Sequence, residues 1–134
     1  MTGFFDTNIL VYAFSDGPKR QPAREALAIG GMISAQVLNE FTNVSRRKQK
    51  REWVEIEAAL AVVRGRFPKV VPLTAETHAA ALVIARDEGL AFYDALIVAA
   101  ALEAGCDTLF SEDMQDGRAI GGLTIRNPFL ANAP

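Results

Sequence analysis

Four acidic residues, each placed where an apolar segment meets a polar turn or the start of a helical pattern, are the best candidates for chemistry in this chain. They are Asp6, Glu40, Asp94 and Asp113. The first is the most informative, because residues 3–5 read as a short buried strand and Asp6 follows at its end. A carboxylate at the carboxyl end of a parallel strand usually faces a ligand crevice. The placement therefore predicts one acidic site built from four distant parts of the chain.

Carboxylates that meet in one site need a compensating cation or shared protons, because like charges repel. Mg²⁺ or Mn²⁺ suits such a site, since hard divalent cations prefer carboxylate and water oxygens. Zinc would call for histidine or cysteine ligands, and the chain has one of each, His78 and Cys106. We interpret His78 as a structural or surface residue and Cys106 as a small buried apolar residue. The sequence thus predicts Mg²⁺ or Mn²⁺ as the cofactor.

Polar residues beside the acids are candidates for supporting roles. Asn8 and Ser111 can orient a carboxylate or a metal-bound water, and Asn8 can alternatively cap the first helix. Asp116 can add a metal ligand or make an Asx turn. Glu112 alternates away from Asp113 if the strand before it continues, so we expect its side chain to be solvated.

A divalent cation in such a site can lower the pKa of a water and stabilise the attacking and leaving oxygens at phosphorus. Hydrolysis of a phosphodiester then requires no nucleophilic side chain. The expected chemistry is metal-dependent cleavage of a phosphate ester.

A run of cations follows the segment that carries Glu40. Residues 46–51 hold five cations in six positions, although the formal net charge of the chain is only -2. The run is either a solvated helix end, where cations favour the helix dipole, or a phosphate-contacting surface. Beside an acidic metal site we favour phosphate contact, and the candidate RNA-binding residues are Arg46, Arg47, Lys48 and Lys50.

Apolar periodicity and turn residues predict strands that alternate with helices. We expect strands at 3–5, 70–73, 106–110 and 123–125, an apolar pair at 32–33, and helices at 9–13, 23–29, 35–44, 52–66, 75–88 and 92–102. Trp53 is interpreted as a core anchor. Thr74 is expected to cap its helix without forming a capping box, and Asp94 can be an ordinary N-cap. The alternation implies a parallel sheet covered on both faces.

The bulk properties indicate one soluble domain spanning residues 1–134. No apolar run approaches the roughly 18 residues of a membrane span. The start of the sequence lacks a signal segment, and a single cysteine cannot form an internal disulfide. We therefore expect a cytoplasmic protein with no membrane partner.

Four segments together resemble the PIN-domain nucleases, and in particular the VapC-type toxins of bacterial toxin–antitoxin pairs. They are residues 5–10 (Phe-Asp-Thr-Asn-Ile-Leu), 34–41 (Ser-Ala-Gln-Val-Leu-Asn-Glu-Phe), 93–97 (Tyr-Asp-Ala-Leu-Ile) and 109–114 (Leu-Phe-Ser-Glu-Asp-Met). Their order and spacing cover nearly the whole chain. The resemblance implies a three-layer α/β/α sandwich with a central, mainly parallel sheet.

The same resemblance implies a Mg²⁺-dependent endoribonuclease whose four acids are Asp6, Glu40, Asp94 and Asp113. It also implies an RNA substrate, a homodimer, and a small antitoxin protein whose C-terminal segment blocks the acidic groove. All four acidic positions are filled in this sequence. The pattern therefore favours an active enzyme.

Three other readings compete with this one. A phosphatase of the haloacid dehalogenase type needs a second Asp two residues after the first, and position 8 is Asn. A receiver domain needs a late lysine, and no lysine follows Lys69. A PIN module kept as a non-catalytic RNA-binding or scaffold protein remains an alternative, which metal-dependent turnover would separate from a nuclease.

Overall fold

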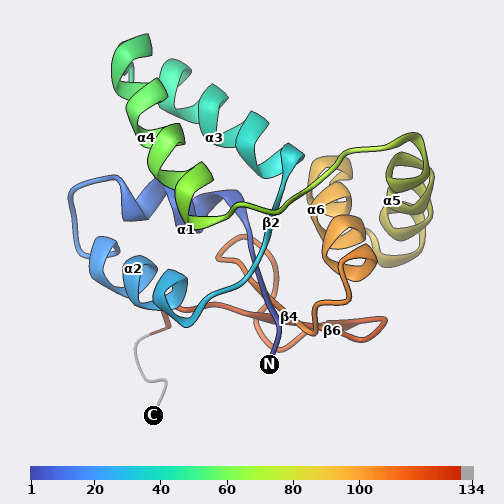
Figure 1. Ribbon diagram of the computed structural model, residues 1–134. Helices are drawn as coiled ribbons and strands as arrows, with labels where there is room; N and C mark the ends of the chain where they lie inside the picture. Colours follow the sequence, from blue (N-terminus) through green and yellow to red (C-terminus); the bar gives the residue numbers. More distant parts are fainter. Residues whose placement is uncertain (131–134) are drawn as a thin grey trace.

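The computed structural model describes residues 1–130, in which helices flank a mainly parallel β-sheet (Figure 1). The strands are β1 (Gly3–Phe5), β2 (Ile33–Ser34), β3 (Val70–Val71), β4 (Thr108–Phe110), β5 (Ala119–Ile120) and β6 (Leu123–Arg126). The helices are α1 (Thr7–Ala13), α2 (Arg20–Ile29), α3 (Ala35–Arg47), α4 (Trp53–Arg66), α5 (Ala75–Glu88) and α6 (Phe92–Glu103). The predicted α/β/α fold class is confirmed.

The sheet brings segments from the two ends of the sequence side by side. β4 lies between β1 and β6 and is parallel to both, while β5 pairs antiparallel with β6 at the edge. β2 and β3 form a second parallel pair. Main-chain hydrogen bonds from Phe5 N to Met32 O (3.0 Å) and from Met32 N to Gly3 O (2.9 Å) join this pair to β1. The carboxyl ends of β1 and β4 are therefore neighbours.

A close approach of two main chains makes this junction possible. A Cβ atom at Gly31 would lie 2.5 Å from the carbonyl oxygen of Gly3 and 2.8 Å from the ring of Phe5. A side chain there would force the strand containing Met32 away from β1, so glycine is required.

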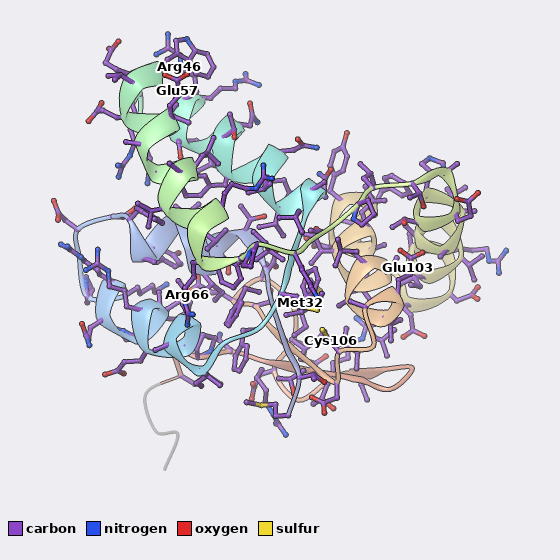
Figure 2. The ribbon with its side chains drawn as sticks, in the orientation of Figure 1. Met32, Arg46, Glu57, Arg66, Glu103 and Cys106 are labelled. Carbon is purple, nitrogen blue, oxygen red and sulfur yellow. The ribbon has the colours of Figure 1, made fainter. Side chains whose placement is uncertain are left out.

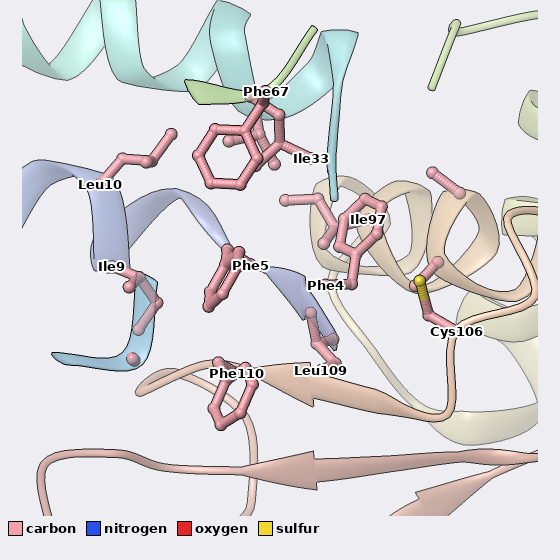
Figure 3. Close-up of a cluster of buried hydrophobic side chains, with 14 of the residues drawn as sticks. Phe4, Phe5, Ile9, Leu10, Ile33, Phe67, Ile97, Cys106, Leu109 and Phe110 are labelled. Carbon is pink, nitrogen blue, oxygen red and sulfur yellow. The ribbon is translucent and has the colours of Figure 1, made fainter. Parts of the chain in front are cut away.

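The core is built on the two central strands, whose residues are all buried. Phe5 stacks on Phe110 of the neighbouring strand with ring centroids 5.3 Å apart (Figure 3). Ile97 from α6 and Leu10 from α1 are almost completely buried in the same cluster. This packing fixes β1, and with it the residue that follows β1.

Cys106 is buried beside Met32, with sulfur atoms 4.0 Å apart, and its thiol donates to the Gly3 carbonyl oxygen at 3.5 Å (Figure 2). The prediction of a small buried residue is confirmed. His78 is exposed on α5 and contacts Phe92 edge-on, with ring centroids 5.2 Å apart, as expected of a structural or surface histidine.

Three local predictions are wrong, and each has a physical reason. Helix α2 begins at Arg20 rather than at residue 23, since Pro22 fits anywhere in a first turn, where N–H groups have no helical partner. Thr74 and Thr77 do form a capping box, because the Thr77 hydroxyl accepts from Thr74 N at 3.4 Å. Trp53 is 54% exposed and stacks on the Arg46 guanidinium instead of anchoring the core.

Strand β5 was not predicted, because two residues carry no readable periodicity. None of the helices in the part of the chain that the structure describes has the length and apolarity needed to cross a membrane.

Candidate acidic metal site

All four predicted acids line a single open cleft of about 650 Å³. The cleft is formed by α1, α3, the N-terminal turn of α6 and the loop after β4. Its lining residues are Asp6, Thr7, Asn8, Val11, Tyr12, Gln36, Asn39, Glu40, Asn43, Val44, Lys48, Tyr93, Asp94 and Asp113. The structure therefore brings the four predicted acids to the lining of one cleft.

Asp6 is the most buried of the four acids. It is the single residue between the end of β1 and the start of α1. It is the N-cap of α1, and its Oδ1 accepts from Thr7 N at 2.7 Å. Its Oδ2 accepts from the Ser111 hydroxyl at 2.6 Å. Burial raises the pKa of Asp6 to about 7, with smaller contributions from the charges of Asp94 and Glu40, and these two hydrogen bonds oppose the rise.

Glu40 is held by two side chains that sequence reasoning missed. The Thr7 hydroxyl donates to Glu40 Oε1 at 2.6 Å, and Gln36 Nε2 donates to Glu40 Oε2 at 3.2 Å. Thr7 and Gln36 are themselves buried. The position of Gln36, one helical turn before Glu40, was the available signal, since residues four apart face each other on a helix.

Asp94 lies in the first turn of α6, three residues after the N-cap Ala91. Among the described residues its carboxylate makes no capping hydrogen bond, so the reading of Asp94 as an ordinary N-cap is wrong. Burial, followed by the charges of Asp113 and Glu40, raises the pKa of Asp94. Within residues 1–130, the Asp94 carboxylate lies in the cleft without a hydrogen-bond or ion-pair partner.

Asp113 is the most exposed of the four acids, and Ser111 connects its segment to Asp6. The Ser111 hydroxyl donates to Asp6 and accepts from Asp113 N at 3.2 Å. Ser111 is fully buried.

Asn8 also lines the cleft, and the alternative that it caps α1 is wrong because Asp6 is the cap. Asn8 Oδ1 accepts from Glu112 N at 3.5 Å. Its Nδ2 is buried and has no hydrogen-bond partner within residues 1–130. A buried donor without a partner costs free energy, so the position suits a ligand oxygen or an ordered water.

Two acids of the same loop lie outside the cleft. Asp116 is exposed, and its Oδ1 accepts from Asn127 N at 2.8 Å, so the structure does not bring it to the other four. Glu112 is not free in solvent as expected, because Lys19 forms an ion pair with it and the Tyr12 hydroxyl donates to its Oε1 at 2.6 Å. Through these contacts Glu112 holds the loop after β4 against α1.

The residues of the basic run at the end of α3 do not all face the cleft. Lys48 lines the cleft. Arg46 is turned away, with its guanidinium 4.8 Å from the centroid of Trp53 and Nη1 donating to Arg51 O at 3.0 Å. Figure 2 shows Arg46 at the outer end of the α3–α4 pair. Arg47 and Lys50 are exposed and do not line the cleft.

The donor set fits a hard divalent cation, since the anionic groups of the cleft are carboxylates and no sulfur or imidazole is among the residues that line it. Within residues 1–130, no three Asp, Glu, His or Cys side chains lie close enough to bind one ion as they stand. Hydrogen bonds from Thr7, Gln36 and Ser111 fix the orientations of the Glu40 and Asp6 carboxylates. The carboxylate side chains would have to move to meet around one ion.

Comparison with known proteins agrees with this geometry. The PIN domain family matches residues 3–116. A toxin–antitoxin complex from Klebsiella pneumoniae is similar in structure, with a TM-score of 0.74, 21% identity, and coverage of 96% of this chain and 98% of that chain. No curated protein sequence matches the chain.

Two further solved structures share the fold. VapBC2 from Rickettsia felis, bound to a DNA fragment from its promoter, gives a TM-score of 0.66 and 24% identity, covering 95% of this chain and 98% of that chain. VapC20 from Mycobacterium tuberculosis, a toxin that cleaves the sarcin–ricin loop, gives 0.64 and 22% identity, with coverage of 84% and 90%. The chain has central parallel strands and an acidic cleft, and its residues 3–116 match the family. This chain belongs to the PIN domain family.

Proposed function

We propose that this protein is a Mg²⁺- or Mn²⁺-dependent endoribonuclease that hydrolyses RNA phosphodiester bonds. The observation that carries the proposal is the meeting of Asp6, Glu40, Asp94 and Asp113 in one cleft of a PIN domain. The raised pKa values of Asp6 and Asp94 support it, since strongly perturbed carboxylates in a cleft are typical of functional sites.

The four acids would hold the divalent cation, which when bound supplies the Lewis acidity that activates water and stabilises charge at phosphorus. Thr7, Gln36 and Ser111 orient the carboxylates of Glu40 and Asp6. The buried Nδ2 of Asn8 is free to donate to a phosphate oxygen or to a water. Lys48 provides the one cation among the cleft-lining residues that the structure describes, and it can hold the RNA backbone near the acids.

The decisive experiment is cleavage of a mixed pool of structured RNAs by the purified protein in the presence of Mg²⁺, Mn²⁺ or EDTA. We expect cleavage with either metal and none with EDTA. A parallel assay with single-stranded and duplex DNA tests the sugar preference. Metal binding without turnover on any nucleic acid would favour a non-catalytic RNA-binding PIN module, and release of phosphate from a small monoester would favour a phosphatase.

We further propose that the protein is the toxin of a toxin–antitoxin pair and that a small antitoxin protein neutralises it. The support is that the toxin–antitoxin complex from Klebsiella pneumoniae and VapBC2 from Rickettsia felis share the fold over nearly the whole of this chain. A partner co-purified from the native host should stop RNA cleavage when the two purified proteins are mixed. Sedimentation of each protein alone and of the mixture tests both the complex and the homodimer that the family resemblance implies.

Thr7→Val tests the support of Glu40. Valine keeps the shape of threonine but removes the hydroxyl that holds Glu40 Oε1, so we expect metal affinity to fall by about 10- to 100-fold, as is typical when a ligand loses its outer partner. Titration calorimetry with Mn²⁺ measures this effect. Thr42→Val is the matched control, since the Thr42 hydroxyl donates to the Leu38 carbonyl of its own helix and Thr42 is not among the residues that line the cleft. Equal affinity in the Thr7 variant would refute the supporting role.

Lys48→Ala and Arg46→Ala separate the two halves of the basic run. Because Lys48 lines the cleft and Arg46 stacks on Trp53, we expect only the Lys48 variant to weaken RNA binding markedly. Loss of one phosphate contact should reduce the slope of log affinity against log salt by about 1. Anisotropy titrations at several salt concentrations measure it, and a larger change in the Arg46 variant would contradict the assignment.

A further inference from the structure

Tyr93 is an aromatic side chain that the fold leaves open at the cleft. It is 63% exposed, it lines the cleft, and it directly precedes Asp94. The residues that follow in α6, from Ala95 to Ala101, are all buried. An exposed tyrosine gives up the stabilisation that its ring would gain from burial.

The fold does not use Tyr93 to fix the start of α6. Phe92 serves that purpose by packing edge-on against His78 of α5, while the Tyr93 ring is tilted and 6.0 Å away from Phe92. Across the described residues the Tyr93 hydroxyl makes no hydrogen bond to the protein. The ring is therefore available to a ligand in the cleft.

The α3 side of the cleft presents amides. Asn39 and Asn43 are exposed, lie one turn apart on α3, and both line the cleft on either side of Glu40 in sequence. Asn39 Nδ2 makes only a long contact of 3.5 Å with Gln36, and no hydrogen bond is present for Asn43 within residues 1–130. Each amide offers donors and an acceptor, the combination that also lines the edges of nucleobases.

The negative charge of the cleft explains why uncharged side chains would be needed there to bind a nucleotide. Four carboxylates line the cleft with one cation, Lys48, so phosphates gain little from electrostatic attraction there before metal binds. Stacking of a base on an aromatic ring is uncharged and contributes affinity for every base type. A neutral contact beside the acids can thus hold a nucleotide that the acids alone would repel.

We propose that Tyr93 and the α3 amides form a nucleobase subsite: a base next to the cleaved phosphate stacks on the Tyr93 ring while its edge faces Asn39 and Asn43. This inference rests on the proposed RNA cleavage. A base inside a duplex has both faces stacked and its pairing edge occupied, so the recognised nucleotide is unpaired.

Binding of a short unpaired RNA to Tyr93 variants, all carrying Asp6→Asn to prevent cleavage, tests the subsite by fluorescence anisotropy. We expect Tyr93→Leu to weaken binding by about 5- to 100-fold, and Tyr93→Phe, which keeps the ring, to stay within about twofold of the parent. The salt dependence should not change, because no charge is removed. Leu82→Ala, which alters an exposed apolar residue of α5 outside the cleft, is the matched control.

In proteins with Asp6 intact, Tyr93→Leu should raise KM more than it lowers kcat, and Asn43→Ala should change the nucleotide preferred at the cleaved bond. Equal affinity of the Leu and Phe variants, or equal cleavage of the same sequence in loop and duplex form, would overturn the subsite while leaving the nuclease intact. Unchanged RNA affinity with an altered sedimentation mass would assign Tyr93 to a protein contact instead. If the unaltered protein cleaves no RNA with any metal, the proposed function fails and the subsite fails with it.

Discussion

Asp6→Asn is expected to abolish metal-dependent RNA cleavage, with a rate loss exceeding the roughly 100-fold that removal of an outer partner causes. Asparagine at position 6 can still accept a hydrogen bond from Thr7 N and form one with the Ser111 hydroxyl. The local structure should therefore persist. What it removes is the negative charge at the deepest point of the cleft. The measurement is single-turnover cleavage with Mg²⁺, with circular dichroism to check the fold.

Asp116→Asn is the matched control for this experiment. Asp116 belongs to the same loop as Asp113 but bonds Asn127 N, a contact that asparagine can keep. We expect near-normal cleavage. A comparable loss in both variants would mean that Asp116 reaches the metal after all, and full activity of Asp6→Asn would remove Asp6 from the site.

The second large effect is on stability in the absence of metal. The pKa of Asp6 is about 7 in the folded protein and 3.8 in an ordinary environment, so between these values the folded state binds more protons than the unfolded state. Stability must then fall as pH rises from about 4 to about 7, by up to roughly 4 kcal/mol from this residue. The raised pKa of Asp94 acts in the same direction.

Thermal unfolding in EDTA at several pH values measures this loss. Asp6→Asn should flatten the curve and make the metal-free protein more stable than the parent at pH 7.5, because the buried charge is gone. Added Mg²⁺ should stabilise the parent at pH 7.5 far more than at pH 5, where Asp6 holds a proton. Parallel pH curves for the parent and the variant would contradict the assignment of the raised pKa to Asp6.

The sequence predicted best those elements that are determined by nearby apolar residues, helix breakers and capping residues. β1 and α5 were predicted with their observed bounds from apolar runs and helix breakers. The four acids were found for the same reason, since each follows or opens an apolar element. Each of these features is determined by residues that are close to it in the sequence.

Features that depend on distant neighbours were not readable. Trp53 shares the face of α4 that buries Ile56 and Val63, but it lies at the helix end, where its described contact is with Arg46 rather than with the core. The pairing of Thr7 with Glu40 joins residues 33 positions apart, and no local pattern marks it. Glu112 was expected to be solvated because it alternates away from Asp113, and no local pattern places Lys19 beside it.

Ser111 joins Asp6 to the Asp113 segment across 105 positions of sequence, and this has a consequence for biosynthesis. β1 emerges from the ribosome first, but its partner β4 and the loop that carries Ser111 follow only after all six helices have been made. Until then Asp6 lacks its buried hydroxyl donor and the strand that positions it. The growing chain therefore has no assembled acidic cleft until β4 and the loop that follows it have been made.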